Sequence, residues 1–227
     1  MKFGELGLSN SLLKAIKRSG YEEATPIQEQ TIPMVLNGDD VIGQAQTGTG
    51  KTAAFGLPIL EHIDPQNPAI QALIISPTRE LAIQTQEELY RLGKDKRAKV
   101  QVVYGGADIR RQIKSLKHQP EILVGTPGRL RDHIRRHTVD LSQINTLVLD
   151  EADEMLNMGF LEDIEAIINE TPATRQTLLF SATMPPEIKR IGMQFMKEPK
   201  TVRIQAQELT TDLVDQYYVR ARDYEKF

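Results

Sequence analysis

A glycine-rich loop, Ala45-Gln46-Thr47-Gly48-Thr49-Gly50-Lys51-Thr52, restricts the fold of this chain more than any other feature. The apolar pair Val41 and Ile42 precedes it, and the residues from Thr52 to Phe55 can open a helix. Glycine allows backbone conformations that other residues resist, so amide groups at a helix start can point at phosphate oxygens. The sequence therefore predicts a strand, a phosphate-binding loop and a helix, in that order.

Two side chains in this loop have predicted roles. Lys51 would reach the β- and γ-phosphates of a nucleotide, and the Thr52 hydroxyl would ligate Mg²⁺. The usual pattern begins with Gly, whereas this loop begins with Ala45. A loop of this kind can also be a surface turn that carries a lysine. The strand-like run before it and the helical stretch after it favour the phosphate site.

An acidic tetrad, Asp150-Glu151-Ala152-Asp153, follows the strand-like run 145–149. Ligands of open α/β sheets bind at the carboxyl ends of strands. Asp150 is therefore expected to hold Mg²⁺ through water, and Glu151 to orient or deprotonate an attacking water. The alternative is an ordinary acidic helix start, because acidic residues suit the first turn of a helix. The phosphate loop favours a catalytic site, with Asp150, Glu151 and Lys51 as its catalytic residues.

The fold class follows from the alternation of two kinds of segment. Amphipathic helical stretches separate strand-like runs near residues 41–44, 71–76, 99–104, 121–125, 145–150, 176–181 and 199–204. This alternation predicts an α/β fold, with a parallel sheet and helices on both faces, in the RecA-like form of a P-loop NTPase. Residues 1–39 are expected to form a helical lead-in, and residues 40–208 the ATP-binding domain.

Composition narrows the class of protein. The 227 residues suffice for one large domain with a sizeable core, and the absence of cysteine excludes disulfides and thiol chemistry. No apolar run approaches the length of a membrane span, so no membrane contact is expected. The N-terminus has no signal-peptide pattern, and a cytoplasmic location is the expectation.

Charge is distributed unevenly along the chain. The net charge is −3, yet residues 91–137 contain thirteen Lys or Arg and four acidic residues. Residues 138–174 contain nine acidic residues and no Lys or Arg. This polarity can guide a phosphate chain to one side of the domain. Most of the basic residues are nevertheless expected on solvated helix faces, and salt-resistant binding of a nucleic acid by this chain alone is not expected.

Taken in order, these motifs resemble the DEAD-box ATP-dependent RNA helicases, a family named for the tetrad at 150–153. The likeness covers essentially the whole chain, and bacterial cold-shock-type members are the most similar. Residues 20–28 resemble the adenine-reading Q motif of the family, with Phe3 as its upstream aromatic residue. The resemblance implies an N-terminal RecA-like domain that uses ATP and Mg²⁺ and binds RNA.

The Q motif has a physical rationale of its own. The Gln28 amide carries both a donor and an acceptor, so it can read adenine and reject guanine. Tyr21 offers a flat face for stacking. The alternatives are a surface glutamine on a helix that Pro26 starts, and core packing of Tyr21 and Phe3. The predicted nucleotide-binding residues are Phe3, Tyr21, Thr25, Gln28, Gln46, Thr47, Gly48, Thr49, Gly50, Lys51 and Thr52.

Three further motifs resemble the RNA-contacting segments of the family. Glycines let a phosphate approach the backbone, and hydroxyl and guanidinium groups donate to phosphate oxygens without reading sequence. The alternatives are an ordinary turn for the glycine pair and a surface salt bridge for Arg129. The predicted RNA-binding residues are Pro77, Thr78, Arg79, Gly105, Gly106, Thr126, Pro127, Gly128 and Arg129.

The resemblance also implies communication between the two ligands. Asp153 would contact Ser181 or Thr183, so that loss of phosphate is transmitted to the rest of the protein. Residues 209–227 would be a linker and the start of a second, C-terminal RecA-like domain that supplies an arginine to the ATP site. This chain alone is therefore expected to bind adenine nucleotide weakly and to hydrolyse little ATP.

Competing functions remain open at this point. The full protein can be a helicase that unwinds short RNA duplexes, or an ATP-dependent RNA clamp that does not unwind them. A DNA-directed relative conflicts with Gln28 and with the tetrad at 150–153. A kinase or GTPase with a phosphate loop would explain neither Gln28 nor the motifs at 77–82, 126–129 and 181–183.

Overall fold

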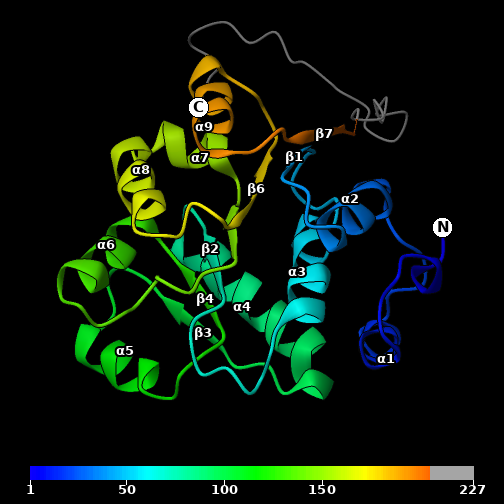
Figure 1. The fold of residues 1–227 in the computed structure, drawn as a ribbon, viewed down its shortest axis with the longest axis horizontal. Helices are drawn as coiled ribbons and strands as arrows, with labels where there is room; N and C mark the ends of the chain where they lie inside the picture. The colour runs from blue at the N-terminus through cyan, green and yellow to red at the C-terminus, as the bar shows by residue number, and fades with distance from the viewer. Residues whose placement is uncertain (205–227) are drawn as a thin grey trace, which may run out of the picture.

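The computed structural model describes residues 1–204, so the predicted linker at 209–227 lies outside the described residues. These residues form a seven-stranded parallel sheet with helices on both faces (Figure 1), which confirms the predicted fold class. Each strand lies within or at the predicted run: β1 Val41–Gln44, β2 Ala72–Ile75, β3 Val100–Val103, β4 Ile122–Gly125, β5 Thr146–Leu149, β6 Gln176–Ser181 and β7 Lys200–Arg203.

The central strands are apolar on both sides. In β2, β4 and β5 every residue is buried, as expected of parallel strands covered on both faces. Successive side chains alternate between two apolar clusters. For example, Ala72 and Ile74 of β2 belong to one cluster, and Leu73 and Ile75 belong to the other.

Within residues 1–204, the first four α-helices cover one face of the sheet, and the last five cover the other face. Besides strand residues, the first apolar cluster contains residues of the N-terminal segment and the first four α-helices, and the second contains residues of the later five α-helices. The first group is η1 Phe3–Glu5, α1 Asn10–Arg18, α2 Pro26–Leu36, α3 Lys51–His62 and α4 Arg79–Gly93, followed by η2 Lys94–Lys96. The second group is α5 Ile109–Leu116, α6 Pro127–Arg135, α7 Ala152–Asn157, α8 Leu161–Asn169 and α9 Pro186–Phe195.

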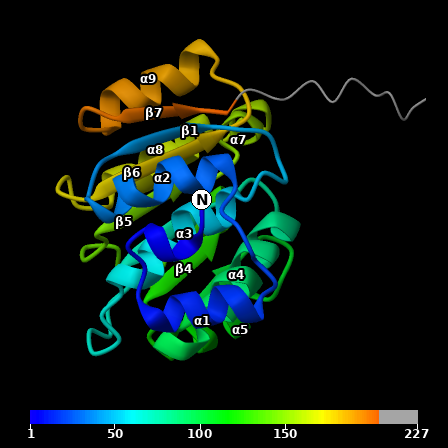
Figure 2. The same ribbon diagram turned by 90° about the vertical axis from the view of Figure 1, so that its right-hand side faces the viewer.

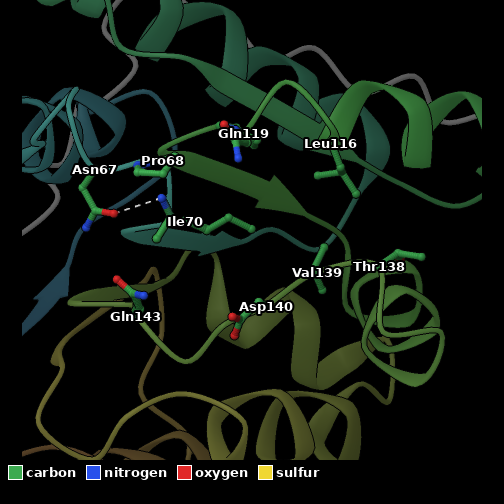
Figure 3. Close-up of a pocket in the computed structure, with 11 residues that line it drawn as sticks. Asn67, Pro68, Ile70, Leu116, Gln119, Thr138, Val139, Asp140 and Gln143 are labelled. Carbon is green, nitrogen blue, oxygen red and sulfur yellow. Dashed lines mark hydrogen bonds between the residues drawn. The ribbon is translucent and has the colours of Figure 1, made fainter.

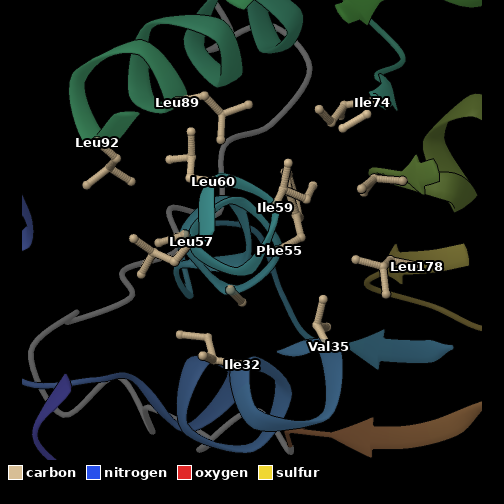
Figure 4. Packing of buried hydrophobic residues seen from close by; sticks show 14 of the residues in the cluster. Ile32, Val35, Phe55, Leu57, Ile59, Leu60, Ile74, Leu89, Leu92 and Leu178 are labelled. Carbon is tan, nitrogen blue, oxygen red and sulfur yellow. The ribbon is translucent and has the colours of Figure 1, made fainter. Parts of the chain in front are cut away.

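Helix α3 lies at the centre of the first cluster (Figure 4), between α2, α4 and the sheet. Phe55 and Leu60 of this helix are fully buried, and each such side chain contributes about 1.5–3 kcal/mol through burial. The helix begins directly after the phosphate loop. Its packing therefore fixes the position of that loop.

The N-terminal lead-in packs against the same face as α3 (Figure 2). Ser9 is the N-cap of α1, and its backbone N–H donates to Glu61 at the end of α3. Pro26 occupies the first turn of α2, where its missing N–H costs nothing. The predicted boundary at residue 39 thus separates two segments that share one apolar cluster.

Strand order decides which loops meet at the carboxyl edge of the sheet. The order is β3-β4-β2-β5-β6-β1-β7. The loops after β1, β6 and β5 are neighbours, and so are the loops after β3, β4 and β2. The two groups adjoin where β2 pairs with β5. Within residues 1–204, no helix has the length and apolar character needed to cross a membrane.

Helices α3 and α4 approach closely at Gly56, where an added Cβ would lie 2.5 Å from Leu89 Cδ2. We predict that Gly56→Ala destabilises the domain by about 1–3 kcal/mol through overpacking, and that Leu89→Ala costs about 2–5 kcal/mol through a cavity. The double variant should lose less than the sum, because the new methyl group occupies space that Leu89 vacates. Urea unfolding of all four proteins measures this coupling, and simple additivity would contradict the close contact.

Candidate functional site

The phosphate loop fills the turn between β1 and α3. Gly48 and Gly50 have left-handed backbone conformations, with φ of 83° and 89°. Gly50 is also the N-cap of α3, and a side chain there would collide with the Gln28 amide. The loop therefore requires glycine at these positions. The first N–H groups of α3, which lack partners within the helix, lie at its base, as an anion site requires.

The two motifs that are predicted to be catalytic contact each other through an ion pair. Lys51 Nζ lies 2.7 Å from Glu151 Oε1 and donates to the Ala45 carbonyl at 3.0 Å. Thr47 Oγ1 donates to the same Glu151 oxygen at 3.1 Å. The Lys51 and Glu151 side chains are 5% and 12% exposed. The structure thus joins the phosphate loop to the acidic tetrad.

The two acidic residues that follow β5 have unusual environments. Asp150 is buried, which raises its pKa to about 7, and the adjacent Glu151 carboxylate contributes in the same direction. The Lys51 ammonium opposes this shift. Glu151 has a left-handed backbone conformation with φ of 50°, which is uncommon for a residue other than glycine. Strain of this kind is concentrated at functional sites.

Two residues, Thr52 and Asp150, are predicted to bind Mg²⁺. No group of three or more His, Cys, Asp or Glu side chains within residues 1–204 could hold a metal ion. Thr52 lies in the first turn of α3, and Asp150 lies at the end of β5. Mg²⁺ in nucleotide sites keeps several waters and takes phosphate oxygens beside one or two protein ligands. Thr52 and Asp150 therefore fit a cation that arrives with a nucleotide.

Asp153 contacts both residues predicted for it. The Asp153 backbone N–H donates to Ser181 Oγ at 3.1 Å, and Asp153 Oδ2 accepts from the backbone N–H and hydroxyl of Thr183, each at 2.8 Å. Burial opposes ionisation of Asp153, but the hydrogen bonds from Thr183 and Ser181 outweigh it and hold the pKa below its usual value. The loops after β5 and β6 are thereby joined.

Gln28 lies against the phosphate loop and is buried. Its Oε1 accepts from the backbone N–H of Thr25 at 3.0 Å, and its Nε2 donates to the Gly50 carbonyl at 3.1 Å. It is therefore not the surface residue of the alternative interpretation. One hydrogen and one lone pair of the amide are left for a ligand.

The two predicted aromatic residues occupy different environments. Phe3 is buried in the first apolar cluster, whereas Tyr21 is partly exposed, and their ring centroids are 6.3 Å apart. Tyr21 donates through its hydroxyl to Glu88 at 2.8 Å, and burial together with this bond raises its pKa to about 12. Phe3 thus packs as a core residue beside Tyr21.

The predicted RNA-binding residues lie in the loops after three neighbouring strands. Thr78 caps α4 by accepting from the Leu81 backbone N–H, and Pro127 opens α6 directly after Thr126. Pro77 lies between β2 and α4 and is buried, and Gly128 is exposed in the first turn of α6. The sheet order brings these loops together.

Two arginines contact the residues on either side of the glycine pair in the loop after β3. The Arg79 guanidinium lies 4.8 Å from the centre of the Tyr104 ring, which is cation–π geometry. Arg129 donates to the Ala107 carbonyl at 3.0 Å, rather than forming the surface salt bridge of the alternative interpretation. Gly105 and Gly106 are exposed between these two contacts.

Comparison with known families decides the identity of this arrangement. The family model of the DEAD/DEAH box helicase matches residues 25–191. The chain belongs to the DEAD/DEAH box helicase family. This confirms the resemblance inferred from the ordered motifs.

Relatives of this DEAD/DEAH box chain are longer than it is. The ATP-dependent RNA helicase CshA of Limosilactobacillus reuteri is 86% identical over 227 residues, which are 100% of this chain and 46% of that protein. The DEAD-box ATP-dependent RNA helicase CshA of Bacillus subtilis (strain 168) is 60% identical over 225 residues, which are 99% of this chain and 46% of that protein. The chain thus spans about half the length of these curated relatives.

Two solved structures of similar proteins have the same fold as this chain. A DEAD box protein from the hyperthermophile Methanococcus jannaschii superposes with a TM-score of 0.87 at 46% identity, covering 90% of this chain and 56% of that chain. A hypothetical ATP-dependent RNA helicase from Sulfolobus tokodaii superposes with a TM-score of 0.81 at 37% identity, covering 87% of this chain and 57% of that chain.

The DEAD/DEAH box domain also contains a buried polar network that sequence reasoning missed. Gln112 Nε2 donates to the Tyr104 carbonyl at 3.0 Å, and Gln112 Oε1 lies 3.2 Å from His133 Nε2. His133 Nε2 must therefore carry hydrogen, while Nδ1 lies 2.7 Å from Thr138 Oγ1. Burial and the Arg129 charge lower the His133 pKa. A signal existed, because Gln112 shares a helix face with Leu116 four residues later.

A cavity of about 420 Å³ lies away from this site (Figure 3). Its walls come from the segments that precede β2, β4 and β5, including Ile70, Pro120 and Val139. None of the predicted site residues lines it. The cavity is therefore at the amino edge of the sheet, opposite the edge where ligands of this fold class bind.

The raised pKa of Asp150 has a measurable consequence. A carboxyl group that stays protonated in the folded state but ionises in the unfolded state reduces stability as pH rises from about 4 to about 7. We predict that Asp150→Asn raises the unfolding free energy by about 1–3 kcal/mol above pH 7, and that this gain disappears near pH 4. Urea unfolding across this pH range measures the difference.

Asp140→Asn provides a control of opposite sign. Hydrogen bonds from Ser142 lower the pKa of the exposed Asp140 carboxyl, so its contribution to stability is present above about pH 4 and is lost as pH falls. This variant should lose a little stability at neutral pH. If Asp150→Asn behaved in the same way, the buried, protonated state of Asp150 would be contradicted.

Proposed function

We propose that this chain is the ATP-binding half of an ATP-dependent RNA helicase. The observation that carries the proposal is the division of the carboxyl edge of the sheet into two groups of loops. The phosphate loop, the acidic tetrad and the 181–183 motif follow β1, β5 and β6, whereas the candidate RNA loops follow β2, β3 and β4. The names of the CshA relatives agree with this assignment.

On the nucleotide side, the Lys51–Glu151 ion pair would act as an exchangeable contact. The β- and γ-phosphates compete with the Glu151 carboxylate for the Lys51 ammonium, since both are anions. When Lys51 moves to the phosphates, Glu151 is released to orient or deprotonate the attacking water. Thr52 and Asp150 would hold Mg²⁺, which would neutralise phosphate charge.

Adenine recognition would rest on the free hydrogen and lone pair of the Gln28 amide. Adenine presents an acceptor at N7 and a donor at N6, whereas guanine presents two acceptors at the same positions. Because Gln28 also contacts Gly50, base recognition and loop conformation are linked. Tyr21 would offer its partly exposed ring to the base, with Phe3 behind it.

On the RNA side, binding would be directed at the sugar-phosphate backbone. The exposed Gly105 and Gly106 allow close approach of a phosphate, and Thr78, Arg79, Thr126 and Arg129 supply donors. Contacts of this type position a strand without selecting its sequence. The Asp153 bonds to Ser181 and Thr183 link the acidic tetrad to the next loop, so a change at the γ-phosphate would be transmitted there.

Unwinding would require the rest of the longer protein. Its C-terminal RecA-like domain would close over the ATP and RNA and supply an arginine, a contribution worth about 10³–10⁵ in rate in related phosphoryl-transfer sites. We therefore expect this chain alone to hydrolyse ATP very slowly, with or without RNA.

Calorimetric binding of ADP and GDP tests the proposed function directly. The wild-type chain should prefer ADP by about tenfold, since bidentate base recognition is worth about 1–3 kcal/mol. Gln28→Ala should abolish that preference. Gln30→Ala, an exposed position on the same helix, should retain it.

Two results would argue against the proposal. Equal affinity of the wild-type chain for ADP and GDP would leave only a general phosphate site. Loss of the preference in Gln30→Ala as well would attribute it to the helix rather than to the Gln28 amide. Circular dichroism of each variant confirms that the fold is retained.

A further inference from the structure

One helix outside the site has an exposed face that is entirely basic. Arg110, Arg111 and Lys114 of α5 are exposed, as is Lys117 at its C-cap. In the described part of the chain none of these four side chains forms an ion pair. The neighbouring α6 differs, because its Arg131 pairs with Asp163. The cations of α5 are therefore available to an external anion.

The spacing of these residues makes a continuous line. Arg110, Lys114 and Lys117 are separated by four and three residues, which places them on one face of the helix. Gln112 and Leu116 are buried on the other face. A helix rises about 10 Å over the seven residues from 110 to 117, which exceeds the distance between successive phosphates of one nucleic-acid strand. The line can therefore follow several consecutive phosphates.

This basic face begins where the candidate RNA loop ends. Gly105 and Gly106 lie a few residues before α5, and Asp108 caps the helix by accepting from the Arg110 backbone N–H at 2.8 Å. The Gln112–Tyr104 hydrogen bond fixes the helix against the same loop. The exposed glycines are therefore directly followed by the start of the basic helix α5.

The chemistry of this face favours nucleic acid over protein. No large hydrophobic side chain of α5 is exposed, whereas the centre of a protein–protein interface is depleted in charged residues and enriched in apolar and aromatic ones. Unpaired cations in a regular line match the repeating charge of a phosphate backbone.

We propose that Arg110, Lys114 and Lys117, with Arg111 beside them, extend the RNA-binding surface beyond the glycine loop and bind the phosphates of single-stranded RNA. The extension rests on the proposed function, because the strand must first be held at Gly105 and Gly106. It adds affinity for RNA that is long enough to reach α5, and it adds no sequence preference.

The chain offers a closely matched pair of variants to test this. Lys114→Gln/Lys117→Gln removes two cations from α5. Lys14→Gln/Lys17→Gln removes two exposed cations at the same spacing from α1, which lies on the other face of the sheet (Figures 1 and 2). Both double variants change the net charge equally. Fluorescence anisotropy with a labelled oligouridylate of about 15 nucleotides measures affinity from low salt upward.

The expected result is specific to α5. At about 50 mM salt the Lys114→Gln/Lys117→Gln variant should bind the RNA roughly tenfold more weakly, and the slope of log K against log salt should decrease by about 0.7 for each lost contact. The Lys14→Gln/Lys17→Gln variant should retain the wild-type affinity and slope. Unchanged thermal unfolding midpoints confirm that both variants fold.

Other results would overturn the proposal in distinguishable ways. Equal weakening by both double variants would indicate a general charge effect. No weakening by either would show that RNA leaves the domain elsewhere. Polyglutamate that binds the wild-type chain as tightly as RNA, and only when Lys114 and Lys117 are present, would assign the face to an acidic protein. Wild-type protein that binds no RNA would contradict the proposed function itself.

Discussion

The 2.7 Å ion pair between Lys51 and Glu151 connects the two motifs on which the account depends. Desolvation of a buried ion pair largely offsets its electrostatic attraction, whereas loss of one partner costs about 3–5 kcal/mol. The Ala45 carbonyl and the Thr47 hydroxyl add hydrogen bonds to the pair. A phosphate that draws Lys51 away from Glu151 substitutes one anion for another, so the exchange leaves Lys51 paired throughout.

The parallel sheet places the loops that this contact joins beside the candidate RNA loops. Loops after β1, β5 and β6 are joined by the Lys51–Glu151 pair and by the bonds of Asp153 to Ser181 and Thr183. Loops after β2 and β3 are joined by Arg79 and Tyr104. Strands β2 and β5 pair directly, with Ile75 opposite Leu149. The candidate nucleotide loops and the candidate RNA loops therefore adjoin at the β2–β5 pair.

Sequence alone predicted the strands well, because buried parallel strands are continuous apolar runs. The catalytic and ligand-binding roles of the residues at their ends stay predictions. The sequence also predicted the partners of Asp153. It could not predict the Lys51–Glu151 pair, since that contact depends on strand order. Strand order likewise decides that the Tyr104 ring meets Arg79. The Gln112–His133 network was missed although Gln112 shares a helix face with the buried Leu116, because that spacing does not identify the partners of the amide. The core position of Phe3 was one of two open alternatives.

The most direct test of the central claim is a crystal structure of this chain with ADP bound. We expect Lys51 Nζ to leave Glu151 and the Ala45 carbonyl and to contact the β-phosphate, with the adenine amine and N7 at Gln28. Phosphates bound elsewhere, with the Lys51–Glu151 contact of 2.7 Å unchanged, would show that this ion pair does not exchange with the nucleotide.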